Sequence, residues 1–318
     1  MFDKLSRALM LSVAENETVR RLTTKYGMAT PDSFARRFIA GENIDEGIEA
    51  TKKLNEGGIT ATLDLLGENV TKVEESHAAK DVFLNILDKI AAEKVDSNIS
   101  MKLTQLGLDL GNDVCIENVH GVIERAAKYN NFVRVDMEGS DYTQRTIDVF
   151  KHLYDKFPEH TGIVLQSYLY RTEFDVRDMN NLGARVRLCK GAYREPEIVA
   201  FQNKKMVDLN YIRCAELLLT EGNYPGIATH DENIINWVKE FTEKEGISKD
   251  KYEFQMLFGI RRDLQRQLVT EGYNIRIYVP FGTEWFPYFS RRLGERIGNV
   301  MFILRNLYRE AGDGKDVI

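Results

Sequence analysis

Two short apolar runs, Phe132-Val-Arg-Val-Asp136 and Gly162-Ile-Val-Leu-Gln166, together with the stretch that separates them, decide the fold. Each run has the length and the aliphatic, β-branched content of a buried strand, and residues 142–157 between them have helical character. Because parallel strands need a long crossover connection, usually a helix, this stretch predicts one βα unit of a parallel sheet.

The same pattern repeats from about Gly57 onward. The expected strands are Ile59–Leu65, Asn98–Leu103, Phe132–Asp136, Gly162–Gln166, Ala184–Cys189, Gly226–Thr229, Tyr252–Leu257 and Asn274–Val279. The expected helices are Ser76–Lys94, Val114–Tyr129, Tyr142–Phe157, Gly191–Glu221, Glu232–Glu245 and Arg261–Glu271. Eight such units in about 250 residues have the dimensions of an α/β fold of the (β/α)8 type, a TIM barrel.

A doubly wound nucleotide-binding sheet is the main alternative fold. Its first strand is normally followed by a glycine-rich phosphate loop. Neither G-x-G-x-x-G nor G-x-x-x-x-G-K-[ST] occurs in the sequence. We therefore favour the barrel, and we expect any bound dinucleotide to be held in another way.

The first 55 residues have a different texture. Apolar residues such as Phe34, Phe38 and Ile48 recur near helical period, without strand-like runs. We expect an N-terminal helical arm over residues 1–55 and a catalytic barrel domain over residues 56–318. The length of 318 residues allows one large domain with an appendage of this kind.

Composition excludes several classes of protein. A net charge of -6 gives no basic footprint for nucleic acid. Three widely spaced cysteines suit reduced thiols in a cytoplasmic protein, and no ligand spacing predicts a metal site. The N-terminus lacks the layout of a signal peptide and no apolar stretch reaches membrane-spanning length. We expect a cytoplasmic protein, and peripheral contact with the inner face of the membrane stays open.

Polar side chains stand at seven consecutive strand ends. They are Lys102, Asp136, Gln166, Arg187 with Lys190, His230, Gln255 and Tyr278. In a TIM barrel the carboxyl ends of the strands carry the active site. Gathering several charges at one barrel mouth is costly unless they pair with each other or with a ligand, so their convergence predicts a site.

A helical segment near the end of the chain adds further charges. Tyr288, Arg291, Arg292 and Glu295 are spaced i, i+3, i+4 and i+7, which places them on one helix face. Taken alone, this face could simply be solvated. Together with Lys102, Arg187 and Lys190, the arginines predict a cationic pocket for a carboxylate or a phosphate. Leu257, Tyr278 and Tyr288 would supply apolar walls.

The sequence shows little sign of a general nucleophile. Its Cys, Ser and His residues form no recognisable triad, and no acidic and histidine cluster has metal-ligand spacing. We therefore expect the chemistry to need a cofactor.

Five motifs occur in order from about Ile59 to Arg296. They are Leu63-Asp-Leu-Leu-Gly-Glu68, Arg187-Leu-Cys-Lys-Gly-Ala-Tyr193, Ala228-Thr-His-Asp231, Phe254-Gln-Met-Leu-Phe-Gly259 and Arg291-Arg-Leu-Gly-Glu295. This combination resembles the FAD-dependent proline dehydrogenases, specifically the short monofunctional bacterial type. The resemblance implies a distorted (βα)8 barrel whose last helix lies over the strand ends. It also implies oxidation of L-proline to 1-pyrroline-5-carboxylate by hydride transfer to N5 of FAD, the first step of proline degradation to glutamate.

The resemblance also implies roles for individual residues. The proline carboxylate would be bound by Lys102, Arg291 and Arg292, with Asp136 and Glu295 pairing to the basic groups and Leu257, Tyr278 and Tyr288 around the ring. The FAD contacts would be Gln166, Arg187, Lys190, Gly191, Ala192, Tyr193, Thr229, His230, Gln255 and Glu295. Arg187 would favour the reduced flavin electrostatically. Glu68 would close the site by pairing with Arg291.

Partners and alternatives follow from the same resemblance. The family implies a membrane quinone as electron acceptor and a pyrroline-5-carboxylate dehydrogenase as the enzyme that takes the product. Hydroxyproline is a rival substrate, although two pocket tyrosines favour proline. A Schiff-base aldolase using Lys102 or Lys190 is a rival reaction. A binding module built on the N-terminal arm is a third alternative, but it would leave the polar strand ends unexplained.

Overall fold

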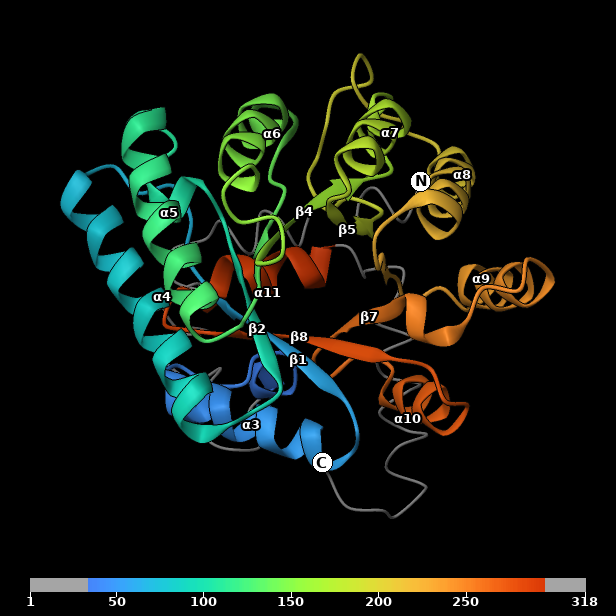
Figure 1. The fold of residues 1–318 in the computed structure, drawn as a ribbon, viewed down its shortest axis with the longest axis horizontal. Helices are drawn as coiled ribbons and strands as arrows, with labels where there is room; N and C mark the ends of the chain where they lie inside the picture. The colour runs from blue at the N-terminus through green and yellow to red at the C-terminus, as the bar shows by residue number, and fades with distance from the viewer. Residues whose placement is uncertain (1–33, 295–318) are drawn as a thin grey trace.

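The computed structural model of the protein describes residues 34–294, with side chains for residues 35–290. Eight parallel strands form a closed barrel in which each strand pairs with the next and β8 pairs with β1 (Figure 1). The strands are β1 (Thr60–Leu65), β2 (Ser97–Met101), β3 (Val133–Val135), β4 (Thr161–Gln166), β5 (Arg185–Cys189), β6 (Gly226–Ala228), β7 (Glu253–Leu257) and β8 (Ile275–Phe281). The predicted TIM barrel is confirmed.

A ring of helices surrounds the strands, as Figure 1 shows. Its members are α3 (Ile44–Glu56), α4 (Val73–Glu93), α5 (Asn112–Lys128), α6 (Ser140–Tyr154), α7 (Thr172–Leu182), α8 (Lys204–Glu221), α9 (Glu232–Lys244) and α10 (Arg262–Thr270). Short 3-10 turns lie at Phe34–Arg37 (η1), Thr104–Leu106 (η2) and Lys249–Lys251 (η3). A further helix, α11 (Trp285–Gly294), stands apart from the ring.

The helices differ from the sequence expectations at two places. Helix α7 was not predicted, because its 11 residues bury little apolar surface beyond Val176 and Met179. The helix expected from Gly191 begins only at Lys204. Gly191 has a φ of 109°, which a right-handed helix does not allow, and Asn203 caps the true start by accepting from the backbone N–H of Lys205.

The barrel has two chemically different faces. Strand residues that face the helices are apolar and buried, as Leu63, Ile99 and Val135 illustrate, and they form the main core. Side chains alternate along a strand, so the intervening residues point into the barrel. These include Thr62, Asn98, Ser100, Arg134, Arg187, Glu253, Gln255 and Arg276. A typical TIM barrel fills this space with branched apolar side chains, whereas here it is polar and charged.

Helix α3 completes the ring of helices. It packs on both β1 and β8, and in Figure 1 it occupies the part of the ring between α4 and α10. Its buried Ile48 belongs to the main core. The boundary expected at residue 55, between arm and barrel, therefore falls inside a helix that packs on the barrel, and residues 1–33 of the expected arm lie outside the described residues.

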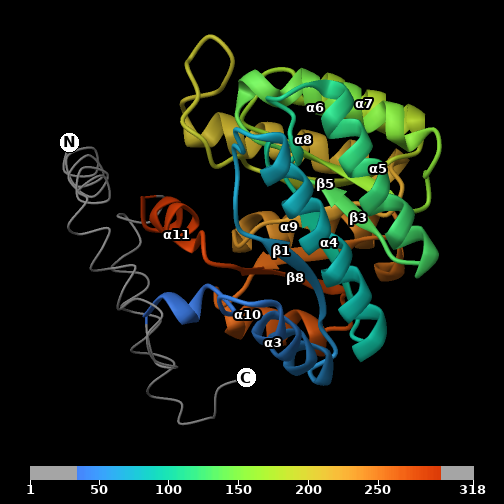
Figure 2. The same cartoon turned by 90° about the vertical axis from the view of Figure 1, so that its left-hand side faces the viewer.

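Helix α11 lies across the carboxyl ends of the strands, as the resemblance implied. Figure 2 shows it beyond the end of β8 rather than in the outer ring. A small second core holds it there: the buried Trp285 and Phe289 pack with Phe38 of the segment before α3. Leu66 and Ile260, from the loops after β1 and β7, complete this cluster. The apolar face of α11 thus covers the mouth of the barrel.

Within residues 34–294, no helix combines the length and the hydropathy that crossing a bilayer requires.

Candidate active site

A cavity of about 560 Å³ opens at the carboxyl ends of the strands. That size is typical of small-molecule and cofactor sites. Fourteen residues predicted for the site line it: Lys102, Asp136, Gln166, Arg187, Lys190, Gly191, Ala192, Tyr193, Thr229, His230, Gln255, Leu257, Tyr278 and Tyr288. Arg291 and Arg292 belong to α11, but their side chains lie outside the described residues, as does Glu295 altogether.

Arg187 is the centre of a buried hydrogen-bond cluster. Its Nη1 donates to Asp136 Oδ1 at 2.8 Å and to Ser100 Oγ at 3.1 Å, while its Nε donates to Gln255 Oε1 at 2.5 Å. Tyr278 OH donates to the other oxygen of Asp136 at 2.7 Å, and its ring centroid lies 5.2 Å from the guanidinium carbon. Four strands therefore fix the position of this guanidinium.

Lys102 and Asp64 form a second buried pair. The ammonium nitrogen of Lys102 lies 3.1 and 3.3 Å from the two carboxylate oxygens of Asp64. Burial raises the pKa of Asp64 to about 6, because it outweighs the opposing effect of Lys102. Burial lowers the pKa of Lys102, but Asp64 and Asp136 act against it, and the net result is a raised pKa. Lys102 is therefore a fixed positive charge in the wall of the cavity.

Lys190 is held by acidic residues at the other side of the cavity. Its ammonium lies 2.6 Å from Asp208 Oδ1 and 2.8 Å from Asp231 Oδ2. Asp231 also caps α9 by accepting from the N–H of Asn233. Although burial acts to raise the pKa of Asp231, its hydrogen bond with Lys190 lowers the pKa below the usual value. An anionic ligand would meet Lys190 as a cation that is already partly neutralised.

Three further site residues have their polar groups oriented by the backbone. Gln166 Nε2 donates to the carbonyl of Glu138 at 2.8 Å. Thr229 Oγ1 accepts from the N–H of Asp231 at 3.1 Å. His230 Nε2 accepts from the N–H of Leu257 at 3.0 Å, so this ring nitrogen carries no proton.

Apolar side chains form the remaining wall. Leu257 and Tyr278 pack against the small core that includes Tyr288. Burial and the neighbouring Asp136 raise the pKa of Tyr278 well above its ordinary value, so its phenol stays neutral and donates. A small aliphatic or heterocyclic acid suits this combination of apolar wall and fixed cations.

Several residues at or beside the cavity were missed. Asp64 closes a polar strand end like the others, but Leu65 and Leu66 follow it directly, which hid the signal. Asp231 and Arg261 also line the cavity. Both lie in loops after the strands. Asp231 belongs to the motif Ala228–Asp231 and Arg261 to a basic pair that could bind an anion, but neither was assigned to the site.

The donor set fits a flavin nucleotide. Arg187 Nη2 is buried and has no hydrogen-bond partner among residues 35–290, so one strong donor is left for a ligand. Gln166, Arg187, Lys190 and Thr229 offer the neutral and charged hydrogen-bonding groups that a ring system with amide-like edges and a pyrophosphate would need. Among the described residues, no three His, Cys, Asp or Glu side chains come together as a metal site.

The structure also explains why the Arg187–Tyr193 motif contains a glycine at position 191. Gly191 has a φ of 109°, and a Cβ there would lie 2.4 Å from the Tyr168 ring. Any side chain at this position would push the loop away from the cavity wall.

Comparison with known proteins gives one consistent family. The family model for proline dehydrogenase matches residues 47–305. Proline dehydrogenase of Deinococcus radiodurans is 40% identical over 313 residues, covering 97% of this chain and all of the relative. Proline dehydrogenase 1 of Bacillus subtilis is 36% identical over 304 residues, covering 96% of this chain and 99% of the relative.

A solved structure agrees with these sequence matches. The crystal structure of proline utilization A from Bdellovibrio bacteriovorus, inactivated by N-propargylglycine, superposes with a TM-score of 0.76 at 25% identity. The match covers 90% of this chain and 38% of that larger one.

Proposed function

The chain belongs to the proline dehydrogenase family and is an oxidoreductase that acts on proline, and we propose that it oxidises L-proline to 1-pyrroline-5-carboxylate with FAD as its cofactor. The observation that carries the proposal is the gathering of fourteen expected residues around one cavity at the strand ends. FAD, when bound, supplies the hydride acceptor.

We propose that basic side chains hold the substrate carboxylate. Lys102 is buried, charged and fixed by Asp64, so it can offer N–H donors without moving. Arg291 and Arg292 would add paired donors that match the geometry of a carboxylate, with Glu295 holding them in place. Leu257, Tyr278 and Tyr288 would exclude water from the ring of the substrate.

We propose that the opposite wall holds the cofactor. Gln166, Arg187, Gln255 and His230 would contact the flavin ring system, and Lys190, with the Gly191–Tyr193 loop and Thr229, would contact the ribityl and phosphate groups. Arg187 keeps its charge beside the place where negative charge develops, so it would stabilise the reduced cofactor electrostatically.

The state of the lysines disfavours the aldolase alternative. A Schiff-base lysine needs a lowered pKa to act as a nucleophile. The pKa of Lys102 is raised instead, and Lys190 is paired with two carboxylates.

A spectroscopic experiment tests the proposal. The purified protein should be yellow with a flavin spectrum, and anaerobic addition of L-proline should bleach it. A colourless protein, or a flavin that proline leaves oxidised, would overturn the proposal. Trapping by borohydride in the presence of a carboxylic acid would support the aldolase instead.

Substitution of the arginines tests the carboxylate clamp. Arg291→Met or Arg292→Met should raise KM for proline about 10- to 100-fold, because each removes a charge-assisted hydrogen bond of about 1.5–3 kcal/mol. The flavin should stay bound. Arg125→Met, on the outer helix α5, is the matched control and should leave KM unchanged. A wild-type KM in both arginine variants would contradict the assignment.

We also propose the partners that the family implies. A membrane quinone would reoxidise the reduced cofactor, and a separate dehydrogenase would take up pyrroline-5-carboxylate. Steady-state reduction of a soluble quinone analogue with proline as donor measures the first proposal, and no turnover with any quinone would refute it.

A further inference from the structure

A polar chain runs through the interior of the barrel from its closed end to its mouth. Arg276 Nε donates to both oxygens of Glu253, at 2.9 and 3.1 Å, and Gln255 Nε2 donates to Glu253 Oε1 at 2.5 Å. Gln255 Oε1 then accepts from Arg187 Nε at 2.5 Å, and Arg187 reaches Asp136. The chain therefore connects a residue distant from the cavity with one that lines it.

The hydrogen-bond chemistry allows the Gln255 amide only one orientation. A carboxylate such as Glu253 can only accept, and an arginine Nε–H can only donate. The amide nitrogen must therefore face Glu253 and the amide oxygen must face Arg187. The reversed amide would place N–H against N–H on one side and oxygen against oxygen on the other.

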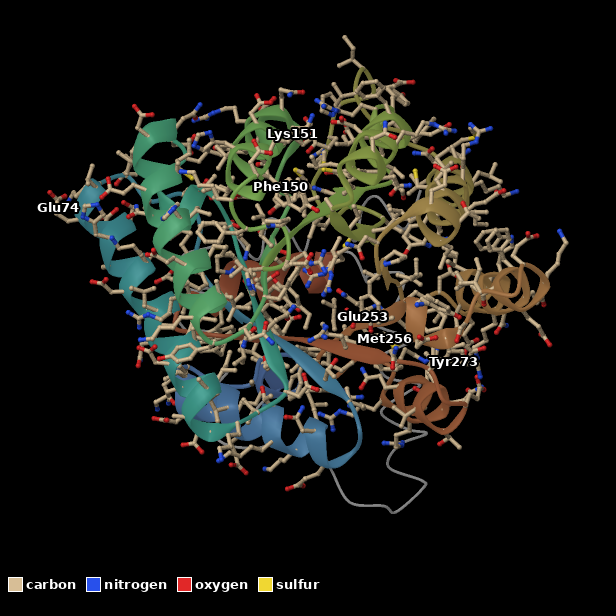
Figure 3. All side chains as sticks on the ribbon, viewed as in Figure 1. Glu74, Phe150, Lys151, Glu253, Met256 and Tyr273 are labelled. Atoms are coloured by element: carbon tan, nitrogen blue, oxygen red, sulfur yellow. The ribbon has the colours of Figure 1, made fainter. Side chains whose placement is uncertain are left out.

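Glu253 is held firmly enough to impose this orientation. Its side chain is 3% exposed, and Arg276, its ion-pair partner, also donates to the carbonyl of Ala61 at 2.8 Å. Figure 3 shows Glu253 on β7 near the centre of the molecule, whereas Lys151 lies on one of the surrounding helices. Glu253 does not line the cavity, so its packing does not depend on a ligand.

A glycine provides the space for the chain. Gly226 on β6 is the register partner of Glu253, and a Cβ at Gly226 would lie 2.4 Å from Gln255 Nε2. Real Cβ atoms do not approach other atoms so closely, so a side chain here would displace the Gln255 amide.

The chain ends on Arg187, which lines the cavity and keeps one nitrogen for a ligand. Gln255 occupies Nε of Arg187, and Asp136 and Ser100 occupy Nη1. Nη2 has no partner within residues 35–290. The direction in which Nη2 points is thus set by groups that the chain from Glu253 holds in place.

We infer that Glu253 is a positioning residue, which fixes the Gln255 amide and through it aims the guanidinium of Arg187 at the cofactor. This inference rests on the proposed function, in which Arg187 contacts the flavin. Glu253 itself touches neither substrate nor cofactor.

The test removes the ion pair of Glu253 and Arg276 at the closed end of the barrel. Glu253→Met combined with Arg276→Met removes both members of this ion pair, so neither of the two is left as an unpaired buried charge and the fold should survive. The Gln255 amide then loses the acceptor that holds its nitrogen, and only Arg187 still binds its oxygen. We expect the Kd of FAD, measured by titration of the apoprotein, to rise about tenfold and the visible bands of the bound flavin to shift. We expect kcat to fall about tenfold, or about 1.4 kcal/mol, with KM for proline within about twofold.

A second variant acts on the same amide from the other side. Gly226→Ala displaces only the end of a flexible side chain, so it should fold, and it should reproduce the shifted flavin bands and the weaker FAD binding. Thr62→Val is the matched control: it removes a buried hydrogen bond to Asn98 inside the same barrel, outside the chain to Arg187. The control should lower the melting temperature without moving the flavin bands.

The outcomes separate this inference from the proposed function. If proline bleaches the wild-type flavin but both test variants keep its spectrum, FAD Kd and kcat, Glu253 has only a structural role and the inference is wrong. If the double variant does not fold, Gly226→Ala decides alone by the same measurements. If the wild-type protein binds no flavin, the proposed function fails first.

Discussion

At the scale of single residues, the Lys102 and Asp64 pair gives the site its dependence on pH. The carboxyl of Asp64 has a pKa of about 6, above the value of about 3.9 for a free aspartate. The folded protein therefore takes up a proton more readily than the unfolded chain. The stability that this group contributes is present below pH 4 and is lost as the pH rises through about 6.

Activity should follow the opposite course. Below about pH 6, Asp64 is protonated and no longer holds the ammonium of Lys102, so kcat/KM for proline should decline on the acid side of this value. Asp64→Asn should remove this limb of the pH profile and raise KM about tenfold at pH 8, because Lys102 loses a buried charged hydrogen bond. The measurement is kcat/KM from pH 5 to 9.

A half-buried pair far from the cavity lining provides the control for this pH profile. Asp88→Asn removes a carboxylate that binds Arg125 on the outer helices, and it should leave the acid limb in place. If Asp64→Asn also retained the limb, Asp64 would not be the group that titrates.

Single residues also show what the sequence could reveal of the site. Lys102, Asp136, Arg187 and Gln255 were predictable because each ends or interrupts an apolar strand, and barrel geometry brings such positions together. What could not be predicted was the pairing among them. Glu253 and Arg276 alternate along their strands like residues that face solvent, and only closure of the barrel turns that side into an interior.

At the scale of elements, a close approach of backbones attaches the N-terminal segment to the barrel mouth. Gly259, in the loop after β7, has a φ of 71°, and a Cβ there would lie 1.6 Å from the carbonyl oxygen of Arg37. Arg37 ends η1, whose neighbour Phe38 packs on α11. Contact at Gly259 thus aligns the segment that supports α11.

Substitution of Gly259 should weaken the packing of α11 over the cavity. Gly259→Ala should force Arg37 away, destabilise the packing of α11 and raise KM for proline. Gly272→Ala is a matched control, because its φ of 78° gives the same backbone strain while nothing lies within 4 Å of its Cβ. The difference between the two variants in KM and in proteolysis of α11 measures the contact. Equal effects would show that only backbone strain matters.

Elements also differed in how well the sequence predicted them. Each expected strand lies within two residues of its observed bounds, because apolar runs flanked by polar residues are clear signals. Helix α7 and the start of α8 could not be found from apolar periodicity. Their bounds depend on local caps, such as the left-handed Gly183 after α7 and the Asn203 cap before α8.

At the scale of the whole molecule, the interior of the barrel is polar, whereas the interior of a typical TIM barrel is apolar. Two glycines, Gly162 and Gly226, take positions where branched side chains usually stand, and they make room for Arg134 and Gln255. Burial and the charge of Arg187 lower the pKa of Arg134 to about 9, which shows how crowded with cations this interior is. Stability therefore rests on the outer layer between strands and helices.

Substitution of a glycine inside the barrel should lower the free energy of unfolding, whereas substitution of a glycine on an outer helix should not. At Gly162 a Cβ would lie 2.5 Å from the Arg185 carbonyl of the paired strand and 2.6 Å from Arg134, so Gly162→Ala should lower the unfolding free energy by about 1–3 kcal/mol.

Gly121→Ala in the middle of α5 is the control for this effect. The added Cβ meets only Lys80, at 3.7 Å, so this substitution should raise the free energy of unfolding by up to about 1 kcal/mol. Urea unfolding of both variants checks the difference. If Gly162→Ala left the free energy of unfolding unchanged, the barrel interior would have room for the added methyl group.

The overall architecture followed from the sequence, but its closure did not. Eight βα units predicted a barrel, whereas nothing in the pattern showed that α3 would stand beside β8 and β1, and only the family resemblance indicated that α11 would leave the ring. These placements depend on contacts such as that between Phe38 and Phe289, which lie at opposite ends of the described chain.

The position of α3 has a consequence for how the protein is made. Thr60 bonds to the carbonyl of Ile275, 215 residues later, so β1 and the helix α3 that precedes it must wait for the last strand of the barrel. Until β8 emerges, β1 has an open edge and α3 has an uncovered apolar face, both of which invite association with other chains. The growing chain is most vulnerable to misassembly until β8 emerges, and barrel closure is the event that ends that exposure.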